Sequence, residues 1–204
     1  MKATLTNDKL PLSFYKRDVL TVARELLGKI LIRKKNKRTF AGIIVETEAY
    51  DGKIDEAAHS FKGKTKRNET MFNGAGTLYV YFTYGNHYCC NVVTGNVGDG
   101  CAVLIRAVEP INEIKAMAMN RYNRKSITEK EFINLANGPG KLCKAFSINL
   151  EDQSIDLNAE KIFILKSPVT KSKNISVATR IGISKSVDLP WRFFITDNKF
   201  VSRK

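Results

Sequence analysis

The chain has 204 residues, of which 43% are hydrophobic and 26% charged, a composition typical of a globular protein that can bury a core. Its 34 lysines and arginines exceed its 20 acidic residues and give a formal net charge of +14, which favours a polyanionic partner such as nucleic acid. The composition excludes a collagen-like, coiled-coil or wholly disordered chain, and no apolar run approaches the roughly 18 residues that a membrane-spanning helix needs.

The N-terminal third of the sequence predicts a helix followed by a β-hairpin. Residues 14–27 carry apolar side chains at helical spacing and are followed by Gly28, a common residue just past a helix end. The short apolar segment 30–32 and the segment 41–48 predict two strands. We interpret the basic stretch between them, residues 33–38, as the hairpin turn.

The middle of the chain predicts a long irregular connection and then a run of strands. Residues 51–76 are polar and contain glycine, and a connection of this length in a compact domain is usually functional. Residues 77–84, 88–93 and 102–107 read as three strands. The glycine-rich segment 95–100 joins strand to strand, so we interpret it as a hairpin and not as a dinucleotide-binding turn.

The following part of the chain predicts three helices. Residues 110–122 form the first, and residues 128–136 form the second, which opens with the capping-box residues Thr128 and Glu131. A third helix is expected over residues 141–146, after a glycine-rich turn.

The last part of the chain is strand-like, with apolar segments at 162–165, 181–183 and 193–195. Strands outnumber helices and are joined mostly by short turns. The sequence therefore predicts the α+β class: a single compact domain over residues 1–204, with a curved, mostly antiparallel sheet flanked by helices.

Cysteines and histidines are few and badly spaced for a metal site or a disulfide framework. They are Cys89, Cys90, Cys101, Cys143, His59 and His87. The N-terminal segment lacks the apolar core of a signal peptide. We therefore expect no metal, no cofactor, and a reduced protein in the cytoplasm.

The densest group of chemically capable side chains lies between residues 46 and 59. On a strand, Glu46 and Glu48 point to the same face, and Tyr50 and His59 follow shortly after. A solvated strand end would explain this pattern without any function. Two carboxylates about 7 Å apart at Cα would also suit a carbohydrate hydrolase, although the net charge argues against that substrate.

Tyrosines are concentrated on the strand predicted at 77–84. Tyr79 and Tyr81 share one face, and Tyr84 stands at the exit of the strand before Gly85. Core packing explains some of these rings. An aromatic ring at a strand tip of a basic protein also suits base stacking or insertion into a DNA duplex.

Several segments, in the same order and spacing, resemble the alkyladenine (3-methyladenine) DNA glycosylase family. They are ETEAY at 46–50, DEAAHS at 55–60, MF at 71–72, GTLYVY at 76–81, YG at 84–85, LIRAVEP at 104–110 and GPGKLC at 138–143. The resemblance extends from about residue 14 to residue 194, which is nearly the whole chain.

The resemblance implies a catalytic group at three positions. Glu48 matches the general base that activates water, and Arg106 matches the residue that helps to hold that water. Ile181 matches the position whose backbone carbonyl also contacts the water.

The resemblance also implies how a base would be bound. Tyr50 matches the ring on one side of the base, and His59 with Tyr81 matches the other side. Asn91 matches a residue that crowds the 2-amino group of normal guanine, so that guanine is rejected.

Contacts with the duplex are implied at four further positions. Tyr84 matches an intercalating wedge, and Leu104 matches an apolar residue near that wedge. Lys141 and Lys144, at the helix after the glycine-rich turn, are candidates for contacts with the DNA backbone, although solvated helix lysines would look the same.

The family's activity then becomes the expectation for this chain. It would flip alkylated purines, mainly 3-methyladenine, out of duplex DNA and hydrolyse the N-glycosidic bond, leaving an abasic site. Hypoxanthine is a further possible substrate. We expect the protein to be a monomer that acts on double-stranded DNA at the nucleoid. We expect no membrane partner. A non-catalytic, basic nucleic-acid-binding domain remains the alternative.

Overall fold

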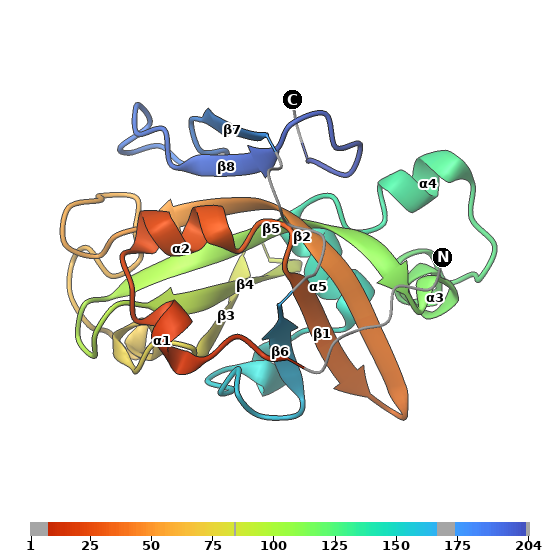
Figure 1. Cartoon of the computed structure of the whole chain (residues 1–204), viewed down its shortest axis with the longest axis horizontal. Helices are drawn as coiled ribbons and strands as arrows, with labels where there is room; N and C mark the ends of the chain where they lie inside the picture. Colours follow the sequence, from red (N-terminus) through yellow and green to blue (C-terminus); the bar gives the residue numbers. More distant parts are fainter. Residues whose placement is uncertain (1–7, 84, 167–173, 203–204) are drawn as a thin grey trace.

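A single antiparallel sheet organises the computed structural model, which describes residues 8–83, 85–166 and 174–202. Its strands lie in the order β3-β4-β5-β2-β1-β6, and β8 pairs with β2 and β7 (Figure 1). The strands are β1 (Ile30–Lys35), β2 (Arg38–Tyr50), β3 (Leu78–Thr83), β4 (His87–Thr94), β5 (Cys101–Asn112), β6 (Ile162–Leu165), β7 (Ile175–Ala178) and β8 (Arg192–Ile195). All of these pairings are antiparallel, which confirms the predicted sheet.

Short helices pack against this sheet, and the fold is α+β as predicted. They are α1 (Leu12–Tyr15), α2 (Val19–Glu25), α3 (Ile114–Tyr122), α4 (Glu129–Ile133) and α5 (Pro139–Phe146), with 3₁₀ turns η1 (Glu69–Phe72) and η2 (Leu150–Asp152). Apolar residues of α2 and α5 join those of β2, β4 and β5 in one continuous core. None of the helices in the described part of the chain has the length and apolar character needed to cross a bilayer.

The helix predicted over residues 14–27 is wrong as one element, because the chain forms α1 and α2 with a break between them. Asp18 explains the break. Its side chain accepts a hydrogen bond from the Thr21 backbone N–H at 2.9 Å and so caps a new helix instead of continuing the first. Arg17 bonds back to the Phe14 carbonyl, which satisfies the end of α1.

The hairpin turn is also shorter than predicted. Only Asn36 and Lys37 form it, with φ values of 50° and 60°, while the neighbouring basic residues belong to β1 and β2. A two-residue turn with positive φ at both positions matches the twist of the flanking strands. The basic side chains therefore line a strand pair, where lysine and arginine stems can pack along the sheet.

Two further predictions at strand boundaries are wrong. Pro110 does not begin a helix but lies on β5, opposite Gly42 and beside a register shift in β2, where a missing N–H is tolerated. Residues 181–183 form a loop, and the strand in this region is β7. The capping box of Thr128 and Glu131 is confirmed at the start of α4.

The longest strand, β2, positions the candidate site. It pairs with β5 along one edge, and with β1 and then β8 along the other. Register shifts around Glu46 bend the strand and so curve the sheet. The register also places Glu48 beside Leu104 of β5, and Leu104 beside Asn91 of β4. This row of three residues crosses the sheet where a cavity opens.

Candidate active site

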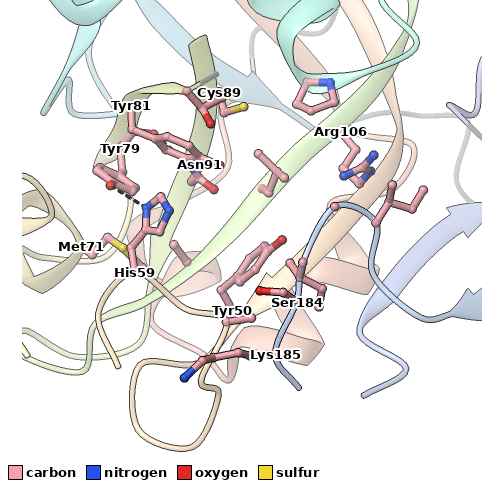
Figure 2. A pocket seen from close by; sticks show the side chains of 18 of the residues that line it. Tyr50, His59, Met71, Tyr79, Tyr81, Cys89, Asn91, Arg106, Ser184 and Lys185 are labelled. Carbon is pink, nitrogen blue, oxygen red and sulfur yellow. Dashed lines mark hydrogen bonds between the residues drawn. The ribbon is translucent and has the colours of Figure 1, made fainter. Parts of the chain in front are cut away.

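A cavity of about 320 Å³ opens on the sheet, at the small end of the range of about 300–1,000 Å³ typical of ligand sites. Its walls come from β2 to β5, from the connection after β2, from the first residue of α5 and from the loop 181–185. Figure 2 shows Tyr50 and Arg106 on one side of the cavity, with His59, Tyr79 and Tyr81 on the other.

Glu48 lies directly behind the cavity wall, with no exposed surface. One carboxylate oxygen, Oε2, accepts hydrogen bonds from Tyr50 Oη at 2.8 Å and from Arg106 Nη1 at 3.1 Å. The other, Oε1, accepts from the Ile181 backbone N–H at 2.7 Å. A carboxylate has about four acceptor positions, so the donors among the described residues leave one position on Oε1 for a further ligand.

Ile181 contacts the site through its backbone N–H. The resemblance points to the backbone carbonyl of Ile181 as a contact for water. The structure shows its backbone N–H donating to Glu48, and the residue lining the cavity. Ile181 thus lies at the predicted site, and the contact of its carbonyl with water stays a prediction.

Glu46 has a different role from Glu48, although both carboxylates face the same arginine. Its Oε1 accepts from Arg106 Nε, from Arg192 Nη1 and from the Ser202 hydroxyl, and its Oε2 accepts from the Ser202 backbone N–H at 2.7 Å. Arg192 and Ser202, which supply three of these four donors, do not line the cavity, whereas all three residues that donate to Glu48 do. Glu46 is therefore less suited than Glu48 to contact a ligand in the cavity, which argues against a paired-carboxylate hydrolase.

Arg106 connects the two carboxylates and lines the cavity. Burial alone would lower the pKa of its guanidinium, but the carboxylates of Glu48 and Glu46 outweigh burial and raise it above the usual value. Burial and the neighbouring Glu48 likewise raise the pKa of the Tyr50 phenol well above 10. At neutral pH Arg106 is charged and Tyr50 is a protonated donor.

Aromatic rings form the far wall. Tyr79 and Tyr81 stack with ring centroids 5.5 Å apart, and His59 meets Tyr81 edge-on at 4.5 Å. His59 Nδ1 shares a hydrogen bond of 3.0 Å with the Tyr79 hydroxyl, and burial raises the pKa of Tyr79 to about 12. This wall faces Tyr50 across the cavity, an arrangement that can hold a flat ring between aromatic surfaces (Figure 2).

His59 is expected to be neutral at pH 7. Burial lowers the pKa of its imidazole below the usual 6.5, and the positive charge of Arg67 lowers it further. The ring C2 proton should titrate below pH 6.5 in an NMR experiment, and the His59→Gln variant identifies its resonance. Since the folded pKa is depressed, neutral His59 stabilises the fold above pH 6.5, and this contribution is lost as pH falls through the folded value. Titration at or above 6.5 would contradict this prediction.

The remaining predicted base contacts have clear positions. Asn91 is buried at the cavity wall, and its Nδ2 donates to the Tyr79 carbonyl at 3.1 Å. Leu104 is only 3% exposed and lines the cavity on β5, between Glu48 and Asn91. Tyr84 falls outside the described residues.

The two lysines predicted to contact DNA differ in their surroundings. Lys141 is half-buried in α5, and its Nζ donates to the side-chain carbonyls of Asn134 at 3.3 Å and Asn137 at 2.8 Å. Burial, together with the charge of Arg121, lowers its pKa. Lys144 is exposed.

Sequence reasoning missed Arg180 and Asp55, which form a buried ion pair beside the cavity. Both lie next to residues that the resemblance singled out, since Asp55 opens the segment 55–60 and Arg180 precedes Ile181. Their positions in or beside these segments were the only signal that the sequence offered, and it did not indicate that the two side chains pair.

The chain is similar to known proteins over nearly its whole length. Residues 13–199 match the family model described as methylpurine-DNA glycosylase. A protein of Carboxydothermus hydrogenoformans is 48% identical over 196 residues, covering 96% of this chain and 99% of that protein. Proteins of Clostridium botulinum and Bacillus cereus are 44% and 43% identical, over 94% and 95% of this chain and 97% and 98% of their own. All three bear the name "Putative 3-methyladenine DNA glycosylase".

Proposed function

The chain belongs to the methylpurine-DNA glycosylase family, and from this membership and the cavity we propose that it excises 3-methyladenine and related alkylpurines from duplex DNA. The observation that carries the proposal is the buried Glu48 carboxylate. It stands behind an aromatic cavity and keeps one acceptor position for a water molecule.

The reaction we propose is hydrolysis by an activated water. Water held between Glu48 and Arg106 attacks C1′ of the flipped nucleotide and gives its proton to Glu48. The bond between C1′ and the base nitrogen breaks, and its electron pair stays on the base, whose positive charge it neutralises. Glu48 also stabilises the positive charge that develops on the sugar. A neutral base such as hypoxanthine would need a proton donor in addition, and we assign none.

The cavity walls support a stacking role in this reaction. A flipped base would lie between Tyr50 on one side and His59 with Tyr81 on the other. A cationic alkylpurine gains about 0.5–2 kcal/mol over an aromatic face. Neutral His59 does not oppose that charge. Asn91 and Leu104, which both line the cavity, would contact the edge of the base. Because Leu104 is buried, we assign it to the pocket and not to intercalation.

Base flipping leaves a gap in the duplex. We propose that Tyr84 fills this gap, because its position matches the wedge of the family that the sequence resembles. Its neighbour Thr83 lines the cavity, and Gly85 has φ of 69°, which allows a tight turn at this end of the hairpin. A wedge at this place would enter the duplex next to the pocket that receives the base.

A basic loop beside the cavity is the surface we propose for the DNA backbone. The side chains of Lys62, Lys64, Lys66 and Arg67 are exposed, and the loop contains no acidic residue. The buried carboxamide of Asn68 holds the loop in shape. It donates to the His59 carbonyl at 2.7 Å and the Gly63 carbonyl at 3.0 Å, and it accepts from the Thr65 N–H at 2.6 Å.

Neutralising this loop should reduce the salt dependence of DNA binding. Each phosphate contact adds about 0.9 to the slope of log K against log salt, so K62Q/K64Q/K66Q should lower the slope by about 2–3. The control K37Q/K125Q/K130Q removes equal charge from exposed positions at the other end of the sheet, in the β1–β2 turn, between α3 and α4, and on α4 (Figure 1). If both variants lower the slope of log K against log salt equally, DNA binding depends on the net charge of the protein and not on this loop.

The proposed activity is tested by incubating the protein with methylated duplex DNA and identifying released bases by chromatography. Free 3-methyladenine and an intact abasic strand are expected. Borohydride added during turnover should trap no protein–DNA adduct, since no lysine is assigned as nucleophile. Absence of released base, with binding intact, would favour the non-catalytic nucleic-acid-binding domain.

A further inference from the structure

Two segments far apart in the sequence meet beside the cavity through one buried ion pair. Arg180 follows β7, and Asp55 lies in the connection after β2. Neither side chain is exposed to solvent, and two guanidinium nitrogens of Arg180 bond the two carboxylate oxygens, with Nη2 to Oδ1 at 2.8 Å. Nη2 also donates to the Ser186 carbonyl at 3.3 Å. The loop from Arg180 to Ser186 is therefore held at both ends by the same guanidinium.

The same arginine contacts the strand that carries the site. Its Nη1 donates to the Ala49 carbonyl at 2.9 Å, and its guanidinium lies 4.6 Å from the ring centroid of Tyr50. The next residue, Ile181, donates its N–H to Glu48. Arg180 and its neighbour therefore touch three consecutive residues of β2, and the two outer ones are the proposed base and stacking ring.

We infer that the Arg180–Asp55 ion pair positions Glu48 and Tyr50 for base excision, which makes both members positioning residues. The inference rests on the proposed function. Arg180 is held by its bonds to both Asp55 and Ala49. Because Ile181 is the next residue, these bonds also fix the position of its N–H relative to the Glu48 carboxylate. Arg180 also packs one face of Tyr50, so that only the other face is left for a base.

Stability alone is a weak reason for this arrangement. Apolar residues of similar volume often replace a buried ion pair without loss of stability, because removing charges from water is costly. An apolar pair could fill the space, but it could not bond the Ala49 carbonyl or hold the loop in register with Glu48. The geometry of the forked guanidinium is the property that only this pair supplies.

The experiment compares two double variants that each neutralise a buried arginine–aspartate pair. R180Q/D55N removes the pair beside the site. R33Q/D152N removes a pair between β1 and η2 whose side chains are 1% and 0% exposed and which does not line the cavity. For each variant we measure single-turnover excision at saturating protein, the dissociation constant for undamaged duplex, and the melting temperature.

Both variants should melt at lower temperature, but only R180Q/D55N should lose about 100-fold in excision rate, the effect of misplacing a catalytic group by about 1 Å. Its affinity for undamaged duplex should stay within about threefold of the parent, since phosphate contacts dominate there. Trp191, the single tryptophan, lies 5.4 Å from Arg180, so its emission reports whether the loop remains docked.

If both double variants lose excision equally, the Arg180–Asp55 pair contributes only to stability. If R180Q/D55N excises at the parental rate, the pair has no positioning role. If R180Q/D55N does not fold, Asp55→Asn alone keeps the shape and one acceptor oxygen. It should then lose about tenfold in excision with unchanged duplex binding, and parental excision would overturn the inference. A parent protein that releases no base would instead refute the proposed function.

Discussion

Glu48→Gln is expected to abolish base excision while leaving binding to lesion-containing duplex intact. Glutamine keeps the size of the side chain and one acceptor oxygen, but it cannot take a proton from water or stabilise positive charge on the sugar. General-base catalysis contributes about 10²–10⁴-fold, and this interaction exists only in the transition state. The loss should therefore appear in the single-turnover rate and not in the dissociation constant.

Glu109→Gln is the matched control for this experiment. Glu109 is also a strand carboxylate of the same sheet, where its Oε2 accepts a hydrogen bond from Asn198 at 3.0 Å. Its substitution should leave the excision rate near that of the parent. Near-normal excision by Glu48→Gln would remove Glu48 as the base. Normal DNA binding with no excision in the parent itself would support a binding module instead.

The strand that carries the site was predictable because its signal is local. Alternation of side chains along β2 places Glu46 and Glu48 on one face, and both do meet the same arginine. Local signals also predicted β3, β4 and the capping box of α4. Alternation alone could not distinguish the two carboxylates. That difference comes largely from Ser202, which is 156 residues away from Glu46 and donates two of the four hydrogen bonds to it.

Contacts between distant segments explain what the sequence did not predict. Arg180 and Asp55 are 125 residues apart, and nothing in either segment alone indicates that the two side chains pair. Lys141 looked like a surface lysine at a helix start, but two asparagines from the preceding turn accept its hydrogen bonds. Residues 181–183 are apolar enough for a strand, yet they form a loop that lines the cavity, where the Ile181 N–H bonds Glu48.

The second large effect is expected for Arg106→Gln. Arg106 bonds Glu46 through Nε and Glu48 through Nη1, both at 3.1 Å, so glutamine would leave two buried carboxylates with one cation fewer. In the mechanism that we propose, the attacking water would also lose one of its two hydrogen-bond partners. Removing a fixed electrostatic partner from an active site costs about 10²–10³-fold in rate, and breaking a buried ion pair costs about 3–5 kcal/mol of stability. Single-turnover excision, measured well below the melting temperature, separates the two effects.

Two comparisons decide whether this loss belongs to the site. Arg33→Gln also breaks a buried ion pair, with Asp152, and should lose comparable stability but keep excision near the parental rate. Arg106→Lys keeps the charge, but its single ammonium cannot reproduce the fork that bonds both carboxylates, so excision should recover only in part. Full recovery with lysine would show that charge alone suffices. Equal losses in Arg33→Gln and Arg106→Gln would mean that lowered stability, and not the contact with Glu48, limits the reaction.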